Sequence, residues 1–251
     1  MSWAMAPDDG LGQREVPAAP ETVLAGAEPI RILAAEAAGS GLLAFLAVAA
    51  GILGERFAIH NVGLALLITA LAAASAFFVL ARSLGGLAPS FFNPALALAS
   101  ILAGRLSIST GLIRAGAQIA AAFLGVMLAH LVTNTGLVQA ASQIQSGEGV
   151  WLGEFLATAL FVFAMLAAAR DSTGSAALTG ALCLLACALA TPSTSLANPA
   201  LTLARALTDS FLSIRLSDAL LIAAIQMIAA IAAWAAYRWM HPAPSARRSP
   251  E

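Results

Sequence analysis

The sequence predicts an all-α membrane protein with six transmembrane helices and two re-entrant half-helices, arranged as an inverted repeat. Three observations lead to this fold class. The chain is 60% hydrophobic and only 10% charged, whereas soluble domains carry about 25% charged residues. The tripeptide Asn-Pro-Ala occurs twice, each time before an apolar stretch too short to cross a bilayer. The segments around the two copies also match one another in the same order.

Six apolar segments approach the roughly 20 residues that a helix needs to cross the hydrocarbon. They are predicted at 31–53, 62–82, 111–133, 150–169, 174–191 and 218–240. Two shorter apolar stretches, 94–104 and 199–209, follow the two Asn-Pro-Ala copies. Because neither is long enough to span, we expect both to be re-entrant half-helices.

The two ends of the chain are predicted to be tails outside the membrane. Residues 1–30 are rich in Ala and Pro, lack a basic region followed by an apolar one, and are expected to be a disordered cytoplasmic tail. Residues 241–251 form a second short tail. With the N-terminus inside, most basic residues are cytoplasmic and only Arg56, Arg205 and Arg215 lie outside. This asymmetry predicts a multi-pass protein of the inner (plasma) membrane with both termini in the cytoplasm.

An internal repeat relates residues 31–133 to residues 148–240. In each half, an acid precedes a hydroxyl by four residues in the first span, a glutamine lies in the third span, and two prolines flank the central loop. These residues are Glu36, Ser40, Gln118, Pro89 and Pro94 in the first half, and Glu154, Thr158, Gln226, Pro192 and Pro199 in the second. Each half has three spans, so the second half is inverted, which places a pathway at the bilayer midplane.

The two tripeptides, Asn93-Pro94-Ala95 and Asn198-Pro199-Ala200, have the chemistry of helix starts. Asn is a strong N-cap residue, and Pro suits the first helical turn because its missing N–H costs nothing there. Two such starts from opposite leaflets would meet near the membrane centre and bring the positive ends of two helix dipoles together. Neutral molecules with lone pairs can accept bonds from the amides, whereas cations are repelled.

On these motifs the chain resembles the aquaporin and glycerol-facilitator family (major intrinsic proteins), over about residues 31–240. The resemblance implies an aquaporin-like bundle, a homotetramer with one pore per protomer, and Asn93 and Asn198 as pore asparagines. It also implies that Glu36 and Glu154 are buried acids that support the half-helix loops, as expected of acids within spans. The alternative is that both acids merely lie at the cytoplasmic interface.

The chain departs from this family at the expected selectivity filter. Many members have Arg directly after the second Asn-Pro-Ala, where this chain has Leu201. By resemblance, Ser195 is a second filter residue, and an ungapped count puts the other two at Ala73 and Ala186. We expect this filter to be wide and poorly polar, since it lacks a guanidinium with five donors. Phe91 stands where the family usually has His before the first tripeptide, so that loop is expected to pack differently.

Three other residues have two interpretations each. Arg205 lies one helical turn beyond Leu201 and either reaches back to the pore mouth or pairs with Asp209, which is the favoured interpretation. Cys183 and Cys187 lie four residues apart on one face and either pack as small hydrophobes, which is favoured, or face the pore and bind soft metals.

The stretch "NPALTLARALTDSF" resembles bacterial relatives associated with arsenic resistance, which also have an aliphatic residue in place of the filter Arg.

The sequence therefore predicts a passive transmembrane transport channel for water and small uncharged solutes, including glycerol-sized molecules and metalloid hydroxides such as arsenite. The alternative is a secondary transporter, since such proteins also use inverted repeats and broken helices. Transporters usually carry ionisable groups for ion coupling, whereas the spans here, apart from Asp218 at the start of the last one, hold only Glu36 and Glu154 as acids. We expect no enzyme activity, cofactor, metal site or nucleic-acid partner; the expected partners are the lipid bilayer and small neutral solutes.

Overall fold

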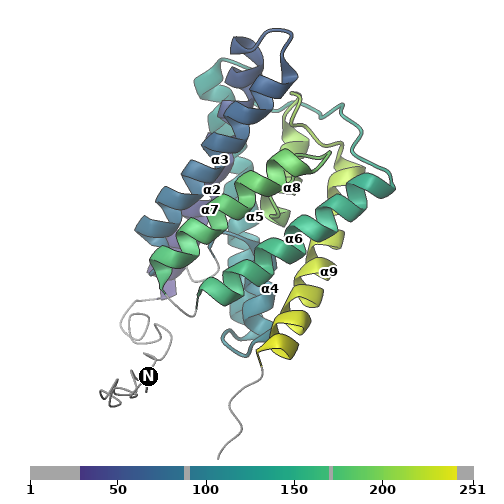
Figure 1. Ribbon diagram of the computed structural model, residues 1–251. Coiled ribbons are helices and arrows are strands. Elements are labelled where there is room, and N and C mark those ends of the chain that lie inside the picture. The colour runs from purple at the N-terminus through teal and green to yellow at the C-terminus, as the bar shows by residue number, and fades with distance from the viewer. Residues whose placement is uncertain (1–28, 88–90, 170–171, 242–251) are drawn as a thin grey trace, which may run out of the picture.

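The computed structural model describes residues 29–87, 91–169 and 172–241 of the chain. The described residues form an all-helical bundle whose long helices lie side by side, with two short helices between them (Figure 1). The long helices are α2 (Pro29–Phe57), α3 (Val62–Leu84), α5 (Ile108–Thr133), α6 (Glu148–Ala168), α7 (Thr173–Ala190) and α9 (Leu216–Met240). The short helices are α4 (Pro94–Leu102) and α8 (Pro199–Ala204), the latter continued by the 3₁₀ turn η1 (Arg205–Leu207).

Six long helices and two half-helices are the elements that the sequence predicted. Five of the long helices are long and apolar enough to cross a membrane, and α7 is shorter, with 18 residues. At 1.5 Å per residue α7 is about 27 Å long, close to the hydrocarbon thickness of roughly 30 Å. Helix α2 begins two residues earlier and ends four residues later than predicted, and α8 ends five residues earlier. The predicted tails lie outside the described residues, apart from residues 29, 30 and 241.

Local capping residues explain where several helices begin and end. The side chains of Asn61, Ser107 and Ser172 accept hydrogen bonds from backbone N–H groups in the first turns of α3, α5 and α7. Each of these bonds satisfies an N–H that the helix itself cannot pair. At the other end of α5, Asn134 adopts a left-handed conformation (φ 52°) and stops the helix.

Small residues let the helices approach closely, as is typical of membrane bundles. Helices α2 and α5 cross at Gly125, where an added Cβ would lie 2.1 Å from the Gly41 carbonyl oxygen. Helices α3 and α7 meet at Gly180, against the ring of Phe77. The half-helices contact the long helices of both repeats, since α4 packs on α5 and α9, and α8 packs on α9 and α5. This arrangement holds the Asn-Pro-Ala starts in the centre of the bundle.

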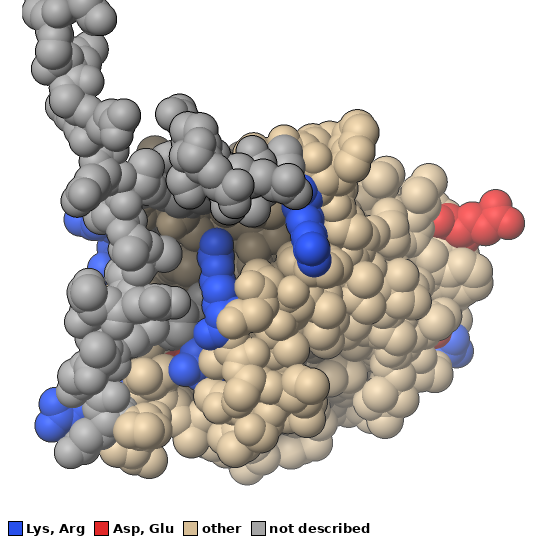
Figure 2. Space-filling model, turned by 90° about the horizontal axis from the view of Figure 1, so that it is seen from below, with Lys and Arg blue, Asp and Glu red and all other residues tan. Residues whose placement is uncertain are grey.

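One end of the bundle is basic. The helix ends and the α4–α5 connection on this side carry exposed arginines at Arg31, Arg82, Arg105 and Arg238. Seen from this side, the surface shows arginine side chains beside a hollow (Figure 2). Arg56 and Arg215 belong to the opposite end, near the loop that links α5 to α6. Arg14, Arg170, Arg247 and Arg248 lie outside the described residues.

Candidate functional site: the junction of the two half-helices

Each half-helix begins at an asparagine that caps it. The Asn93 Oδ1 atom accepts a hydrogen bond from the Ala95 N–H at 2.9 Å, and the Asn198 Oδ1 atom accepts one from the Ala200 N–H at 3.0 Å. In both cases a proline occupies the first turn, as its fixed φ favours. Both asparagines are buried. The amide oxygen is therefore used within its own loop, which leaves the NH₂ group to point outward.

The two NH₂ groups link the loops to each other. Asn93 Nδ2 donates to the Ala197 carbonyl at 2.8 Å, and Asn198 Nδ2 donates to the Phe92 carbonyl at 3.0 Å. Each acceptor precedes the opposite asparagine and has a left-handed backbone, with φ 61° at Phe92 and 50° at Ala197. Such a conformation costs a non-glycine residue about 1–2 kcal/mol. It turns each carbonyl toward the partner loop, so the crossed bonds help to offset its cost.

The first loop is held by a buried acid on α2. Glu36 is fully buried, and its Oε2 atom accepts hydrogen bonds from the Phe92 N–H at 3.0 Å and from Gln118 Nε2 at 2.8 Å. The Ser40 hydroxyl, one turn along α2, donates to the Phe92 carbonyl at 3.1 Å. The Phe92 ring packs on Gly39, where an added Cβ would lie 1.9 Å from it. Glu36, Ser40 and Gln118 thus fix the backbone that presents the Phe92 carbonyl.

The second loop is held by the corresponding acid on α6, but through side chains. Glu154 Oε2 accepts from the Ser195 hydroxyl at 2.7 Å and from Gln226 Nε2 at 2.8 Å. Gln226 also exchanges hydrogen bonds with the hydroxyl of Thr202 on α8. Among the described residues, Glu154 Oε1 and the Thr158 hydroxyl have no hydrogen-bond partner. Within the described part of the chain, Glu154 therefore accepts no backbone N–H bond of the kind that Glu36 accepts.

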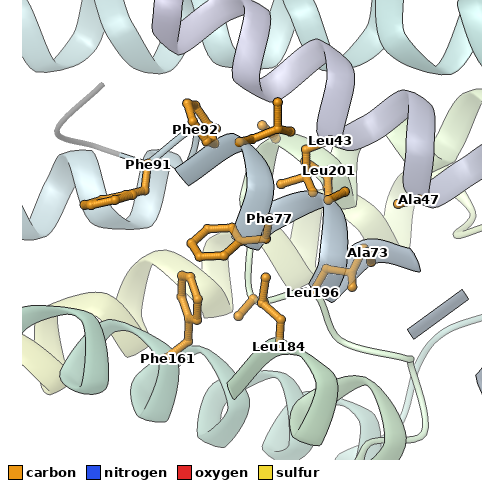
Figure 3. Close-up of a cluster of buried hydrophobic side chains, with 14 of the residues drawn as sticks. Leu43, Ala47, Ala73, Phe77, Phe91, Phe92, Phe161, Leu184, Leu196 and Leu201 are labelled. Carbon is orange, nitrogen blue, oxygen red and sulfur yellow. The ribbon is translucent and has the colours of Figure 1, made fainter. Parts of the chain in front are cut away.

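A narrow cavity begins at the crossed asparagines. It is lined by Asn93 and Asn198. The apolar part of the lining, shown in Figure 3, consists of the side chains of Leu43, Ala73, Phe77, Phe161, Leu184, Leu196 and Leu201. The rings of Phe77 and Phe161 pack edge to face, with 5.7 Å between their centroids. A second cavity shares Leu196 and Leu201 with the first and is lined further by Arg205, Leu212, Val126 and small residues of α2. The lining is almost wholly apolar, apart from the asparagines and Arg205.

The structure corrects two of the four expected filter positions. Ala73 and Leu201 line the first cavity. Ala186 is exposed. It lies on the same face of α7 as the exposed Leu182, so this face points out of the bundle. The ungapped count therefore assigned the wrong residue of α7, and Leu184 lines the cavity instead.

Ser195 lines neither cavity, because its hydroxyl binds Glu154. Leu43, Leu184 and Leu196 were missed by the sequence analysis. Leu196, two residues before Asn198, was the one that proximity to the motif could have suggested. The inward face of α2 and α7 gave no such signal, because both helices are apolar all round.

The expected width of the filter is not seen in this structure. The free space in each cavity is close to what one water molecule needs. Leu196 and Leu201 border both cavities and form the constriction between them, while Leu43 and Leu184 fill the space that a filter of alanines would leave open. The expected apolar character holds, but a solute larger than water has to displace these leucine side chains.

Arg205 does not pair with Asp209, contrary to the favoured expectation. It is buried, and its guanidinium donates to the carbonyls of Ser193 at 3.0 Å, Thr194 at 3.3 Å and Leu212 at 2.5 Å. Asp209 instead accepts from the N–H and hydroxyl of Ser142 in the loop between α5 and α6. The alternative interpretation, that Arg205 reaches back toward the passage, agrees with its place in the second cavity.

The two cysteines lie beside each other on α7. Their Sγ atoms are 3.9 Å apart, and Cys187 is buried against the Ala157 carbonyl of α6. Neither lines the cavities described above. Among the described residues there is no group of three side chains suited to hold a metal ion. Phe91, at the position where the family usually has His, adopts a left-handed conformation. Its ring packs against that of Phe77, with 6.4 Å between the ring centroids.

Comparisons with known proteins agree with this geometry. The sequence profile of the family described as "Major intrinsic protein" matches residues 24–195, which is more than half of the chain. The chain belongs to the major intrinsic protein family. It is also similar to the curated protein "Aquaglyceroporin AqpS" of Rhizobium meliloti (strain 1021), with 34% identity over 206 residues. That alignment covers 82% of this chain and 88% of the relative.

Family membership fixes the general role of the site. The protein is a multi-pass membrane channel for water and small uncharged solutes.

Proposed function

We propose that this channel conducts water and neutral solutes up to the size of glycerol, including trihydroxides of trivalent arsenic or antimony, without coupling to an ion gradient. The observation that carries this proposal is the lining of the passage, in which two asparagine amides are followed by aliphatic side chains and no filter arginine projects from position 201. An amide NH₂ has two hydrogens, and the crossed bond uses one. The second is free to bind a solute oxygen.

The filter of this proposal consists of Ala73, Leu184, Leu196 and Leu201. Aliphatic side chains bind no water strongly, so they do not favour water over a glycerol-sized solute with an apolar surface. They also change rotamer readily, which allows the narrow passage to widen around a larger neutral molecule. The relative's printed name, aquaglyceroporin, supports a solute range that includes glycerol. Arsenite and antimonite follow from the aliphatic residue at position 201 and from the neutrality and size of their hydroxides.

The decisive experiment is stopped-flow light scattering on proteoliposomes that contain the purified protein. Osmotic shrinkage measures water permeability, and re-swelling measures entry of glycerol and arsenite. We expect Leu201→Arg to reduce glycerol and arsenite entry by about tenfold or more while water permeability stays within about threefold. Leu201→Met conserves volume and is the matched control, which should leave all rates within about twofold.

The possible results separate the channel from a transporter. Solute entry that needs an imposed sodium or proton gradient would contradict the proposal and support secondary transport. Equal effects of Leu201→Arg on water and glycerol would show that position 201 blocks the passage without selecting solutes.

The assembly and orientation are part of the proposal. We expect a homotetramer with one pore per protomer, set in the inner membrane with both termini in the cytoplasm. The basic end of the bundle supports this orientation, since cytoplasmic loops of membrane proteins are enriched in Arg and Lys. Light scattering in detergent tests the tetramer, and protease accessibility of a C-terminal tag in sealed inside-out vesicles tests the orientation. No catalytic role is proposed for any residue.

A further inference from the structure

A buried positive charge lies beside the constriction but is anchored away from it. Arg205 is 3% exposed, and all three of its guanidinium nitrogens donate to backbone carbonyls. Two acceptors, Ser193 and Thr194, belong to the loop before α8, and the third, Leu212, belongs to the segment after η1. The charge therefore lies beside helix α8, which carries Leu201, on the wall of the second cavity.

The local sequence explains this placement. Helix α8 gives way to a 3₁₀ turn at Arg205, so the side chain leaves the half-helix one turn beyond Leu201. Leu212 can approach α2 because residue 51 is glycine, where an added Cβ would lie 2.2 Å from the Leu212 Cδ1 atom. Gly51 thus leaves room for the Leu212 side chain, and the Leu212 carbonyl accepts a hydrogen bond from the Arg205 Nε–H group.

Among the described residues, no direct ion pair cancels the charge of Arg205. Its three hydrogen-bond acceptors are neutral carbonyls, and Asp209 is engaged with Ser142. Glu154 interacts with Arg205 electrostatically but binds Ser195 and Gln226 through its carboxylate. In a medium of low dielectric, an unpaired charge raises the energy of a like charge over a distance of several ångströms. The N-terminal ends of α4 and α8 add positive potential at the asparagines.

We propose that Arg205 is the electrostatic barrier to cations and protons in this channel, acting from the wall of the second cavity while its guanidinium donors are bound to backbone carbonyls. This inference rests on the proposed function as a channel for neutral solutes. It separates two properties that an arginine at position 201 would combine. The positive potential is retained, while the guanidinium donors are bound to backbone carbonyls, and the surface shared by the two cavities remains aliphatic at Leu196 and Leu201.

The test compares neutral and charged replacements of Arg205 in the full-length protein. Arg205→Met and Arg205→Gln remove the charge, and Gln keeps an amide donor for the loop carbonyls. Arg205→Lys keeps the charge but loses the planar fork and its simultaneous bonds to three carbonyls. Sodium and proton currents across planar bilayers, together with water permeability of proteoliposomes, are measured for each variant and for the wild type.

We expect both neutral variants to increase cation current by about tenfold or more, while Arg205→Lys stays near the wild-type level. Equal leaks in the Lys and Gln variants would overturn the proposal, because they would assign Arg205 a structural role only. Absence of any increase in the Gln or Met variant would overturn it as well. If Arg205→Met fails to fold, the comparison of cation currents between Arg205→Gln and Arg205→Lys still tests the proposal. A wild-type protein that conducts no water would instead contradict the proposed function.

Discussion

In the first half of the molecule, a buried carboxylate supports the Asn-Pro-Ala loop through the backbone, and in the second half through side chains. Glu36 accepts the Phe92 N–H, whereas Glu154 accepts the Ser195 hydroxyl. Both carboxylates also accept from a glutamine, Gln118 or Gln226. The two halves therefore share the carboxylate and the glutamine amide that binds it, but they differ in the donor from the loop, which is a backbone N–H in the first half and a serine hydroxyl in the second. A backbone N–H cannot be reoriented without moving the chain, so the first loop depends more on its acid.

The largest expected difference between the halves concerns these two acids. Glu36→Ala leaves the Phe92 N–H and the Gln118 amide without their acceptor and should lower the free energy of unfolding by about 3–5 kcal/mol. Glu154→Ala should lower the free energy of unfolding by about 2–3 kcal/mol. The loss is smaller because the Ser195 hydroxyl can rotate to another acceptor and Gln226 keeps its hydrogen bond to Thr202. Denaturant titration of the detergent-solubilised protein measures both. An equal or reversed order would show that the loops depend on their acids alike.

A smaller difference is expected from the crossed asparagines. The Phe92 carbonyl accepts from both Asn198 and Ser40, whereas the bond that the structure gives the Ala197 carbonyl comes from Asn93. Asn93→Ser should therefore destabilise the protein by about 1 kcal/mol more than Asn198→Ser. Serine keeps the N-cap in both variants, so the comparison isolates the crossed bond. The same unfolding titration checks it, and a larger effect at position 198 would contradict it.

The smallest effects are expected where one half has a hydroxyl that the other lacks. Thr202, four residues after Asn198, binds Gln226, whereas the matching residue of the first half is Ala97 and Gln118 Oε1 has no hydrogen-bond partner among the described residues. Thr202→Val should cost about 1 kcal/mol of unfolding free energy.

The reciprocal change sharpens the comparison. Ala97→Ser places a hydroxyl at the position of α4 that corresponds to Thr202 of α8, so the repeat predicts that it donates to Gln118 Oε1. We expect a change between zero and about 1 kcal/mol of added unfolding free energy. A clear loss of stability after Ala97→Ser would mean that the repeat symmetry does not extend to this position.

The sequence by itself determined the elements and their order. Span lengths depend on the thickness of the bilayer, and the starts of the half-helices depend on local chemistry, since Asn caps the helix and Pro fits its first turn. The paired acids and glutamines could be found because their spacing repeats between the halves. These signals are local or periodic, so they survive without knowledge of the packing.

Only the tertiary structure decided which side chains line the passage. A shift of two residues along a helix turns a side chain by about 200°, so the count that chose Ala186 missed Leu184 on the opposite face. Ser195 and Arg205 depend on partners that are distant in the chain or in irregular segments: Glu154 for the serine, and the carbonyls of residues 193, 194 and 212 for the arginine. Such contacts are set by how the loops fold against the bundle, and no local pattern encodes them.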